Sequence, residues 1–157
     1  MRITLMVIGK TNQIWLGDAI NEYVKRITRY ITFDFKILPD IKNAKNLAEQ
    51  QLKEKEGELL LASLLDVDEL VLFDEKGKEY TSEEFAGYIE KKMLASTKSL
   101  VFCIGGAYGF SESVYKKASG KIALSKMTFS HQMVRLIATE QLYRAFSIIN
   151  NEPYHHK

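Results

Sequence analysis

The sequence predicts an α/β fold, in which a mostly parallel sheet is flanked by helices. Short apolar runs of strand length alternate along the chain with longer segments whose apolar residues recur every three or four positions. The resulting order is βαβαβαβαβα, and strands that alternate with helices favour a parallel sheet covered on both faces. The chain has 157 residues and contains neither an internal repeat nor a linker rich in proline and glycine. We therefore expect one domain, residues 1–157.

The first half of the chain holds three predicted strands separated by two predicted helices. Phe33–Leu38 alternates with period two and stops at Pro39, as a strand does. Leu70–Phe73 is a short strand that is expected to be buried, and the run Asp74–Gly77 is expected to end it. The expected elements are, in order, a strand at 3–8, a helix at 14–29, a strand at 33–38, a helix at 44–65 and a strand at 70–73.

The second half continues the alternation with helix, strand, helix, strand and helix. Thr81 or Ser82 is a suitable N-cap for the first of these helices, and Glu84 supplies an acidic residue in its first turn. The strand that follows is the most apolar in the sequence. The remaining expected elements are this strand at 100–104, a short helix near 111–118, a strand at 121–124 and a last helix at about 131–150.

The last predicted helix is apolar on two sides. One apolar stripe runs from Val134 to Ile149, and a second runs from Met133 to Phe146 and is interrupted by Glu140. A helix that is apolar on two faces is expected to be buried on both. The sheet would cover one face, and a second subunit is the simplest cover for the other. The sequence therefore predicts a homodimer.

Charge is distributed unevenly along the chain. The formal net charge is +2, which does not by itself indicate a nucleic-acid-binding protein. Residues 1–110 contain 15 basic and 17 acidic residues, whereas residues 111–157 contain 7 basic and 3 acidic residues. The C-terminal third is therefore the part expected to face a polyanion. A solvated charged face is the more general interpretation of the same pattern, and it stays open.

Cysteine usage and hydropathy indicate the compartment. The single cysteine, Cys103, cannot form an internal disulfide, which favours a reducing environment. The longest apolar stretch, residues 59–65, has seven residues, whereas a membrane-spanning helix needs about 20. No cleavage-type signal follows the apolar run at 3–8. We expect a cytoplasmic protein that does not cross a membrane.

A glycine-rich loop, residues 105–109, follows the most apolar predicted strand. Glycines at the carboxyl end of a parallel strand let a ligand approach the main chain, although a tight turn would need them as well. A dinucleotide fingerprint would follow the first strand, where the chain has only Gly9-Lys10, and no phosphate-binding P-loop motif occurs. An ordinary Rossmann or P-loop enzyme is therefore disfavoured.

Metal and thiol chemistry find little support in the sequence. Cys103 lies in the middle of a predicted strand, where a small buried hydrophobe is expected rather than a nucleophile. The three histidines, His131, His155 and His156, lack the spacing of a metal site, because adjacent histidines chelate poorly and no cysteine pair assists them. We predict no bound metal.

Several segments of the chain together resemble one known family. They are residues 104–109, 124–135, 140–145 and 153–155. These segments resemble the ribosomal RNA large subunit methyltransferase H family, whose members are small SPOUT-class enzymes that methylate ring nitrogen 3 of a pseudouridine in 23S ribosomal RNA. The resemblance covers essentially the whole chain, because the family is about this length and has no other domain. Further segments that fit are Gly9-Lys10, Glu22-Tyr23 with Lys25-Arg26, and Lys55–Glu58. Where the family usually has a proline before its histidine, this chain has Ser130, a good N-cap that is expected to keep the helix start.

The resemblance implies a fold, a cofactor and partners. The family's C-terminal segment threads through a loop to form a deep trefoil knot, which periodicity could not reveal. S-adenosylmethionine, the methyl donor, binds in the knot in a bent conformation, held mainly by backbone groups. The partners implied are a second copy of the chain and 23S ribosomal RNA within the ribosome or large subunit. By similarity, the contacts to the methyl donor are Phe73, Gly105, Leu124, Ser125, Lys126, Met127, Thr128 and Phe129.

Three residues match the family's functional residues, namely Arg144, Tyr154 and His155. The resemblance implies that Arg144 could stabilise an anionic base or hold a phosphate. His155 could accept the proton of the base, and Tyr154 could stack on the base or hydrogen-bond to it. Taken without the resemblance, Arg144 would simply pair with Glu140 four residues earlier, and the chain end would be frayed.

These observations lead to one predicted function and two alternatives. The prediction is S-adenosylmethionine-dependent methylation of ring nitrogen 3 of a pseudouridine in 23S ribosomal RNA by a homodimer. The first alternative is a non-catalytic ribosome-binding factor that keeps the same fold, which the joint presence of Arg144, Tyr154 and His155 argues against. The second is a nucleotide-cofactor enzyme of flavodoxin-like topology, which the missing phosphate loop after the first strand disfavours.

Overall fold

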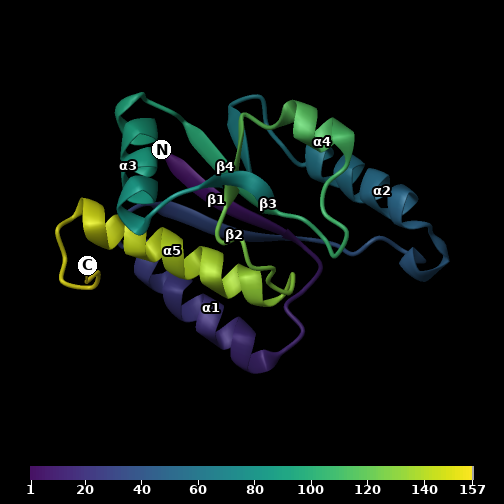
Figure 1. The fold of residues 1–157 in the computed structure, drawn as a ribbon, viewed down its shortest axis with the longest axis horizontal. Coiled ribbons are helices and arrows are strands. Elements are labelled where there is room, and N and C mark those ends of the chain that lie inside the picture. Colours follow the sequence, from purple (N-terminus) through teal and green to yellow (C-terminus); the bar gives the residue numbers. More distant parts are fainter. Residues whose placement is uncertain (157) are drawn as a thin grey trace.

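Five parallel strands form the central sheet, in the order β2-β1-β4-β3-β5 (Figure 1). The computed structural model describes residues 1–156. The strands are β1 (Arg2–Ile8), β2 (Thr32–Leu38), β3 (Asp68–Glu79), β4 (Ser99–Ile104) and β5 (Gly120–Ala123). Each neighbouring pair is parallel. The predicted α/β class is therefore confirmed.

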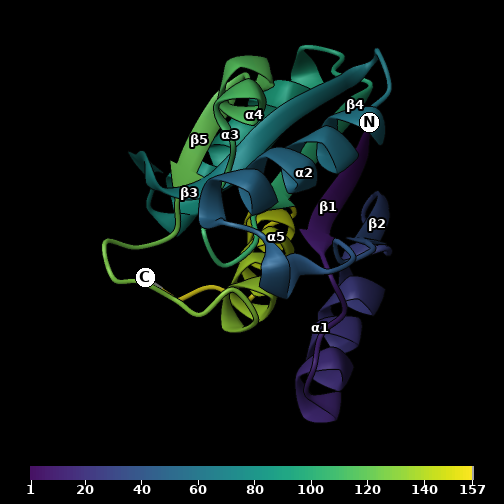
Figure 2. The same ribbon diagram turned by 90° about the vertical axis from the view of Figure 1, so that its right-hand side faces the viewer.

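Helices cover both faces of the sheet (Figures 1 and 2). They are α1 (Ile14–Ile27), α2 (Glu49–Ala62), α3 (Ser82–Leu94), α4 (Glu112–Lys117) and α5 (Met133–Ile149), with a short 3₁₀ turn, η1 (Ala44–Asn46). The helices α1, α3 and α5 pack on one face, and α2 and α4 pack on the other. Among residues 1–156, no helix combines the length and the apolar character that crossing a membrane would require.

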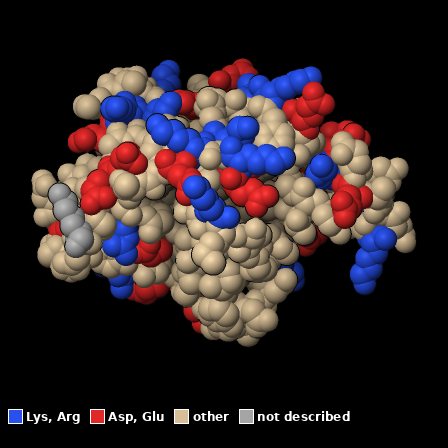
Figure 3. Space-filling view, in the orientation of Figure 1, with Lys and Arg blue, Asp and Glu red and all other residues tan. Residues whose placement is uncertain are grey.

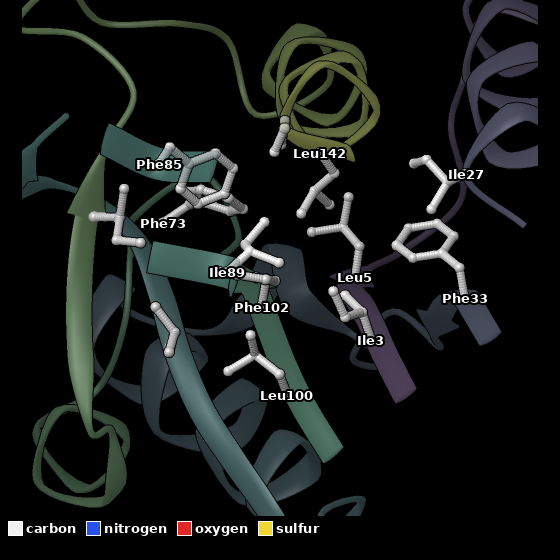
Figure 4. Packing of buried hydrophobic residues seen from close by; sticks show 14 of the residues in the cluster. Ile3, Leu5, Ile27, Phe33, Phe73, Phe85, Ile89, Leu100, Phe102 and Leu142 are labelled. Carbon is white, nitrogen blue, oxygen red and sulfur yellow. The ribbon is translucent and has the colours of Figure 1, made fainter. Parts of the chain in front are cut away.

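Each face of the sheet has its own apolar core. On one face, Leu5 and Phe102 from neighbouring strands meet Leu142 of α5 (Figure 4). On the other face, the alternate residues of the same strands, including Cys103, meet Leu60 of α2. Side chains that alternate between two covered faces explain why these strands read as nearly continuous apolar runs. Cys103 is fully buried, which confirms its interpretation as a core residue.

The two apolar stripes of α5 are covered within the chain more fully than the sequence suggests. Leu142, of the first stripe, is fully buried against the sheet. Phe146, of the second stripe, is also buried and stacks on Tyr30 with ring centres 5.8 Å apart. The neighbouring helices α1 and α3 thus cover part of the α5 surface that a second subunit was expected to cover. Met133, at the start of the second stripe, stays partly exposed.

The helix expected at 44–65 is divided in two. Residues 44–46 form η1, and α2 follows separately. Leu47 and Ala48 are extended, and the side chain of Gln51 accepts a hydrogen bond from the Ala48 N–H at 3.1 Å. This contact satisfies a backbone donor at the start of α2. Local capping therefore overrides the apolar period at the beginning of the predicted helix.

Residues 74–77, expected to end the strand, form a bulge inside a longer strand. β3 continues beyond it, and its pairing with β5 shifts register between Phe73 and Lys78. Gly77 makes this path possible, because a Cβ atom there would lie 2.6 Å from backbone atoms of β5. The prediction that the strand ends at Phe73 is therefore wrong. Between Phe73 and Lys78, the regular pairing of β3 with β5 is interrupted.

Candidate active site

A cleft of about 460 Å³ opens at the carboxyl ends of β4 and β5, beside the bulge in β3. Its walls come from the bulge at 74–76, the loop at 105–110 and the loop at 124–131. The carboxyl edge of the strands is the usual position for ligands in open α/β sheets. The volume also lies within the range of sites for small molecules.

The cleft brings together seven of the eight residues expected to contact S-adenosylmethionine. The exception is Lys126, whose side chain is 88% exposed and approaches Glu79 at 3.8 Å. Residues from distant parts of the sequence thus line one cavity, while the Lys126 side chain points away from it. The seven are Phe73, Gly105, Leu124, Ser125, Met127, Thr128 and Phe129.

Hydrogen bonds between residues close in sequence shape the loop at 124–131. The Met127 N–H donates to the Ser125 hydroxyl at 2.9 Å. At the end of the loop, the Ser130 hydroxyl accepts a hydrogen bond from the Met133 N–H at 3.1 Å. Ser130 therefore satisfies a donor at the start of α5, as expected for a serine in the position where the family usually has proline.

The glycine wall of the cleft rests on a buried acid. A Cβ atom at Gly106 would lie 2.6 and 2.8 Å from the two carboxylate oxygens of Glu56, so a side chain at this position would require the Glu56 carboxylate to shift. Glu56 is 9% exposed, and its Oε1 has no hydrogen-bond partner within residues 1–156. Burial, together with the neighbouring Asp40, raises the pKa of Glu56. The wall therefore exposes main chain to the cleft while its other side packs on a carboxyl group.

The bulge in β3 adds polar groups that motif reasoning misses. Asp74 and Glu75 both line the cleft. The Tyr115 hydroxyl donates to Asp74, and the Thr128 hydroxyl donates to Glu75 at 3.4 Å. Gly77, next to these acidic residues, is the sequence signal that could have indicated a bulge rather than the end of the strand. The cleft thus has an acidic side as well as a glycine wall.

A buried arginine ties the start of α5 to the end of β1. Arg135 is 2% exposed. Its guanidinium donates to the carbonyl oxygens of Ile8 and Gly9, each at 2.8 Å, and to the Thr11 hydroxyl at 3.3 Å. Burial lowers the pKa of Arg135. A charged residue within a helix that is otherwise apolar on two sides is the sequence signal for such an anchor.

The three residues that match the family's functional residues lie together near the other end of α5. Arg144 Nη2 donates to Glu140 Oε1 at 2.5 Å, and the Tyr154 hydroxyl donates to the same oxygen at 2.9 Å. Arg144 also stands over the Tyr154 ring, with its guanidinium carbon 4.8 Å from the ring centre. The simple pair of Glu140 and Arg144 is therefore present, but within a larger group. We call Glu140, Arg144, Tyr154 and His155 the tail cluster.

His155 is held on both sides of its ring. Its Nδ1 lies 3.2 Å from Arg144 Nη1, and its Nε2 lies 3.0 Å from Glu83 Oε1. The His155 side chain is only 16% exposed, so this part of the chain end is packed rather than frayed. None of Arg144, Tyr154 and His155 is among the residues that line the cleft. Within one chain, the cleft and the tail cluster are separate.

Aromatic side chains support the tail cluster. Tyr154 meets Tyr143 edge to face, with ring centres 4.6 Å apart, and its hydroxyl oxygen lies 3.4 Å from that of Tyr23. Burial, followed by hydrogen bonds with Tyr23 and Glu140, raises the pKa of Tyr154. The hydrogen bond to Glu140 likewise raises the pKa of Arg144. Tyr154 is therefore protonated near neutral pH and suits the role of a hydrogen-bond donor rather than a base.

The side chains considered for metal or thiol chemistry occupy different parts of the molecule. His131 lines the cleft, His155 belongs to the tail cluster and His156 is exposed. Within the described part of the chain, no three His, Cys, Asp or Glu side chains are grouped so that they could hold a metal ion. Burial raises the pKa of the Cys103 thiol, so its nucleophilic thiolate form is disfavoured.

Replacing Glu56 by glutamine is expected to increase stability near neutral pH. Because the folded state raises the pKa of Glu56, it favours the protonated form, and this contribution to the free energy of unfolding is lost as pH rises through that pKa. Glutamine stays neutral, so urea unfolding should place Glu56→Gln above the wild type at about pH 7.5 and close to it at about pH 4. Glu58→Gln, an exposed change on the same helix, should follow the wild type at both. A Glu56→Gln protein with a lower free energy of unfolding than the wild type at about pH 7.5 contradicts this expectation.

Comparison with known proteins identifies the family. The sequence profile of the family described as "Predicted SPOUT methyltransferase" matches residues 1–155. A ribosomal RNA large subunit methyltransferase H from Parabacteroides distasonis is 63% identical over 157 residues, which is the full length of both chains. The protein of the same name from Flavobacterium johnsoniae is 58% identical, again over both full lengths. The chain belongs to the ribosomal RNA large subunit methyltransferase H family.

Membership in the methyltransferase H family confirms the family predicted from the sequence and, of the predicted enzyme class, that the protein is a methyltransferase. Among solved structures, one described as a probable methyltransferase from Bordetella pertussis has the same fold, with a TM-score of 0.53. It shares 12% sequence identity over 92% of this chain and 95% of that chain. At this identity the likeness concerns the fold alone.

Proposed function

We propose that this methyltransferase transfers the methyl group of S-adenosylmethionine to ring nitrogen 3 of a pseudouridine in 23S ribosomal RNA. The observation that carries the proposal is the cleft, which gathers Phe73, Gly105 and the loop at 124–131 around one cavity. These are the positions at which the family resemblance places the methyl donor. The relatives from P. distasonis and F. johnsoniae are, by their names, methyltransferases of the large ribosomal subunit RNA.

The lining of the cleft fits a methyl donor of this kind. Phe73 and Phe129 supply apolar walls for an adenine ring, next to the main chain at Gly106. Asp74 and Glu75 place negative charge beside the cleft, which suits a donor with a positively charged sulfur. When bound, S-adenosylmethionine supplies a methyl group on that sulfur for transfer to an electron-rich nitrogen. These residues would hold and orient it.

The tail cluster supplies groups for the other half of the reaction. Ring nitrogen 3 of a pseudouridine carries a proton, which must leave before or during methyl transfer. His155 would accept this proton, Arg144 would stabilise the negative charge left on the base, and Tyr154 would donate a hydrogen bond to the base or stack on it. Holding the reacting nitrogen in line with the methyl group supplies about 7–11 kcal/mol in favourable cases.

We infer that a second copy of the chain completes the site. The reaction needs the cleft and the tail cluster together, whereas one chain keeps them separate. An exposed apolar surface at the starts of α1 and α5, which we call the apolar patch, is available for dimerisation. Figure 3 shows few charged side chains over this lower part of the molecule. The apolar patch consists of Ile14, Trp15 and Met133, exposed by 84, 58 and 37%.

Replacing Trp15 by aspartate is therefore expected to produce a monomer that binds the methyl donor but methylates poorly. A charge within an apolar interface would be buried without a partner. Light scattering at micromolar concentration measures the oligomeric state, and labelled methyl transfer measures activity. Val67→Asp, a change of another exposed apolar residue (51%) just before β3, should leave the dimer intact. A monomeric wild type with full activity ends the inference of a shared site.

We further infer that the substrate surface is ribosomal and that the protein acts in the cytoplasm. The net charge of +2 gives weak attraction to arbitrary RNA. On the face that Figure 3 shows, Lys and Arg side chains lie among Asp and Glu side chains. Recognition of a shaped ribosomal surface fits this distribution better than binding to single-stranded RNA of any sequence. The methyl donor and ribosomes are both cytoplasmic.

Ribosomes from a strain that lacks this methyltransferase test the proposed function directly. Incubation with methyl-labelled S-adenosylmethionine should label 23S ribosomal RNA, and digestion with mass spectrometry should find the label on ring nitrogen 3 of a pseudouridine. Label on another base would refute the proposed position. Ribosome binding without any label would instead favour the non-catalytic ribosome-binding factor.

Calorimetric titration is expected to show binding of S-adenosylmethionine and no binding of NAD or FMN. At 100 times the Kd, the bound ligand should raise the free energy of unfolding by roughly 2.7 kcal/mol. Gly106→Ala tests the glycine wall, because its Cβ atom would lie 2.6 Å from a carboxylate oxygen of Glu56 and require that side chain to shift; weaker binding of the methyl donor is expected. Binding of a nicotinamide or flavin in place of the methyl donor would reverse the assignment of the cleft.

A further inference from the structure

The groups around His155 define which of its ring nitrogens carries the proton. An arginine guanidinium has donors and no acceptor. Because Arg144 Nη1 lies 3.2 Å from His155 Nδ1, this nitrogen must accept with its lone pair. The other nitrogen, Nε2, lies 3.0 Å from Glu83 Oε1 and must carry the proton that it donates to the carboxylate. His155 is therefore held as the Nε2–H tautomer.

The charged and titratable groups that face His155 come from α3, α5 and the chain end. On α5, Glu140 already accepts hydrogen bonds from Arg144 and Tyr154, so its charge is directed to those two groups. Glu83, in the first turn of α3, faces the imidazole directly. The His155 side chain is 16% exposed and that of Glu83 is 42% exposed, so solvent screens this contact only in part.

We propose that Glu83 is a positioning residue for His155, and that Arg144 covers the basic nitrogen until the substrate replaces it. This proposal rests on the proposed function, in which His155 takes the proton of the base. Glu83 fixes the ring orientation and keeps the Nε2 proton in place, which leaves Nδ1 as the nitrogen with a lone pair to offer. Arg144 occupies that lone pair in the structure. An anionic group of the RNA, a phosphate or a base oxygen, competes for Arg144 and uncovers Nδ1.

The proton transfer then proceeds with atoms and charges in balance. The proton of ring nitrogen 3 moves to His155 Nδ1, and the electron pair left on the ring nitrogen forms the bond to the methyl carbon. The bond between sulfur and the methyl carbon breaks with its electron pair on sulfur, which becomes neutral. The imidazolium that forms keeps its Nε2–H on Glu83, whose negative charge offsets the new positive charge.

Nitrogen NMR on protein labelled with ¹⁵N-histidine tests the arrangement without any methylation. The His155 signals, assigned from a His155→Ala sample, should show the proton on Nε2 at about pH 8. Glu83→Gln should lower the pH midpoint of His155 protonation by about half a unit or more, because an opposite charge is lost. Arg144→Ala should raise it, because a cation leaves Nδ1. Glu90→Gln, exposed on the same helix, should change nothing. A proton on Nδ1, or an unmoved midpoint in Glu83→Gln, overturns the proposal.

The pH dependence of methylation separates positioning from mere support of the fold. A base acts unprotonated, so the rate should rise with pH through the midpoint. Glu83→Gln should move this rising limb to lower pH and reduce the plateau by about 2- to 3-fold, because the imidazole becomes a weaker base. Glu83→Asp should restore part of this loss. A lower rate at every pH with an unmoved limb indicates structural support and overturns the positioning role. If the wild type methylates nothing, the proposed function fails, while the NMR result is decided independently.

Discussion

Removal of residues 154–157 is expected to abolish most methylation while leaving the fold and methyl-donor binding largely intact. The truncation takes away Tyr154 and His155, which belong to the tail cluster and do not line the cleft. Loss of the proton acceptor and of a group that holds the base should lower the rate by about 100-fold or more. The lost hydrogen bond to Glu140 and ring contact with Tyr143 should lower the free energy of unfolding by only about 1–2 kcal/mol.

Labelled methyl transfer to ribosomes and calorimetric titration of the methyl donor measure the two halves of this expectation. His156→Ala, an exposed change beside the tail cluster, should keep activity. His155→Ala should lose more rate at low pH than at high pH, because an alkaline medium can take over proton removal. Full activity in the truncated protein would make Tyr154 and His155 a merely structural chain end. Arg144 would then be the only catalytic candidate.

The parts of the fold that could be predicted from the sequence depend on signals between near neighbours. The apolar run at 100–104 becomes β4, with every residue buried, because a strand covered on both faces needs no polar side. The start of α3 follows Thr81, whose hydroxyl accepts from the Glu84 N–H while the Glu84 carboxylate accepts from the Thr81 N–H. Both patterns are complete within a few residues, so tertiary contacts are not needed to read them.

The parts that could not be predicted depend on contacts between distant segments. The bulge in β3 exists because Gly77 passes close to β5. A glycine inside a strand can indicate a bulge, but the sequence does not show which distant strand Gly77 approaches. The motif at 153–155 indicates a functional chain end, but it does not show that Glu83 of α3 holds His155. We also infer, from the resemblance, that the loop at 124–131 belongs to a trefoil knot, and threading is a property of the whole chain path.

Arg135, at the start of α5, joins the end of β1 to the loop that lines the cleft. Its guanidinium holds the carbonyl oxygens of Ile8 and Gly9 at the end of β1. Its Nε donates to the carbonyl oxygen of His131 at 3.3 Å, where the cleft loop passes into α5. Removing one partner from such a buried arrangement leaves polar groups without hydrogen bonds, which is more harmful than the loss of the pair energy alone.

Replacing Arg135 by methionine is therefore expected to lower the free energy of unfolding by about 3 kcal/mol. Each carbonyl left without a hydrogen bond costs about 1–3 kcal/mol. Removing the buried charge is favourable and offsets part of this loss. The fall in Tm should be about 6–12 °C. Arg135→Lys should be intermediate, since an ammonium lacks the rigid fork that reaches both carbonyls, and the exposed change Arg29→Met should be neutral. Methyl-donor affinity should fall with stability, because the same contacts fix the cleft loop; an unchanged Tm and Kd would show that the anchor supports neither.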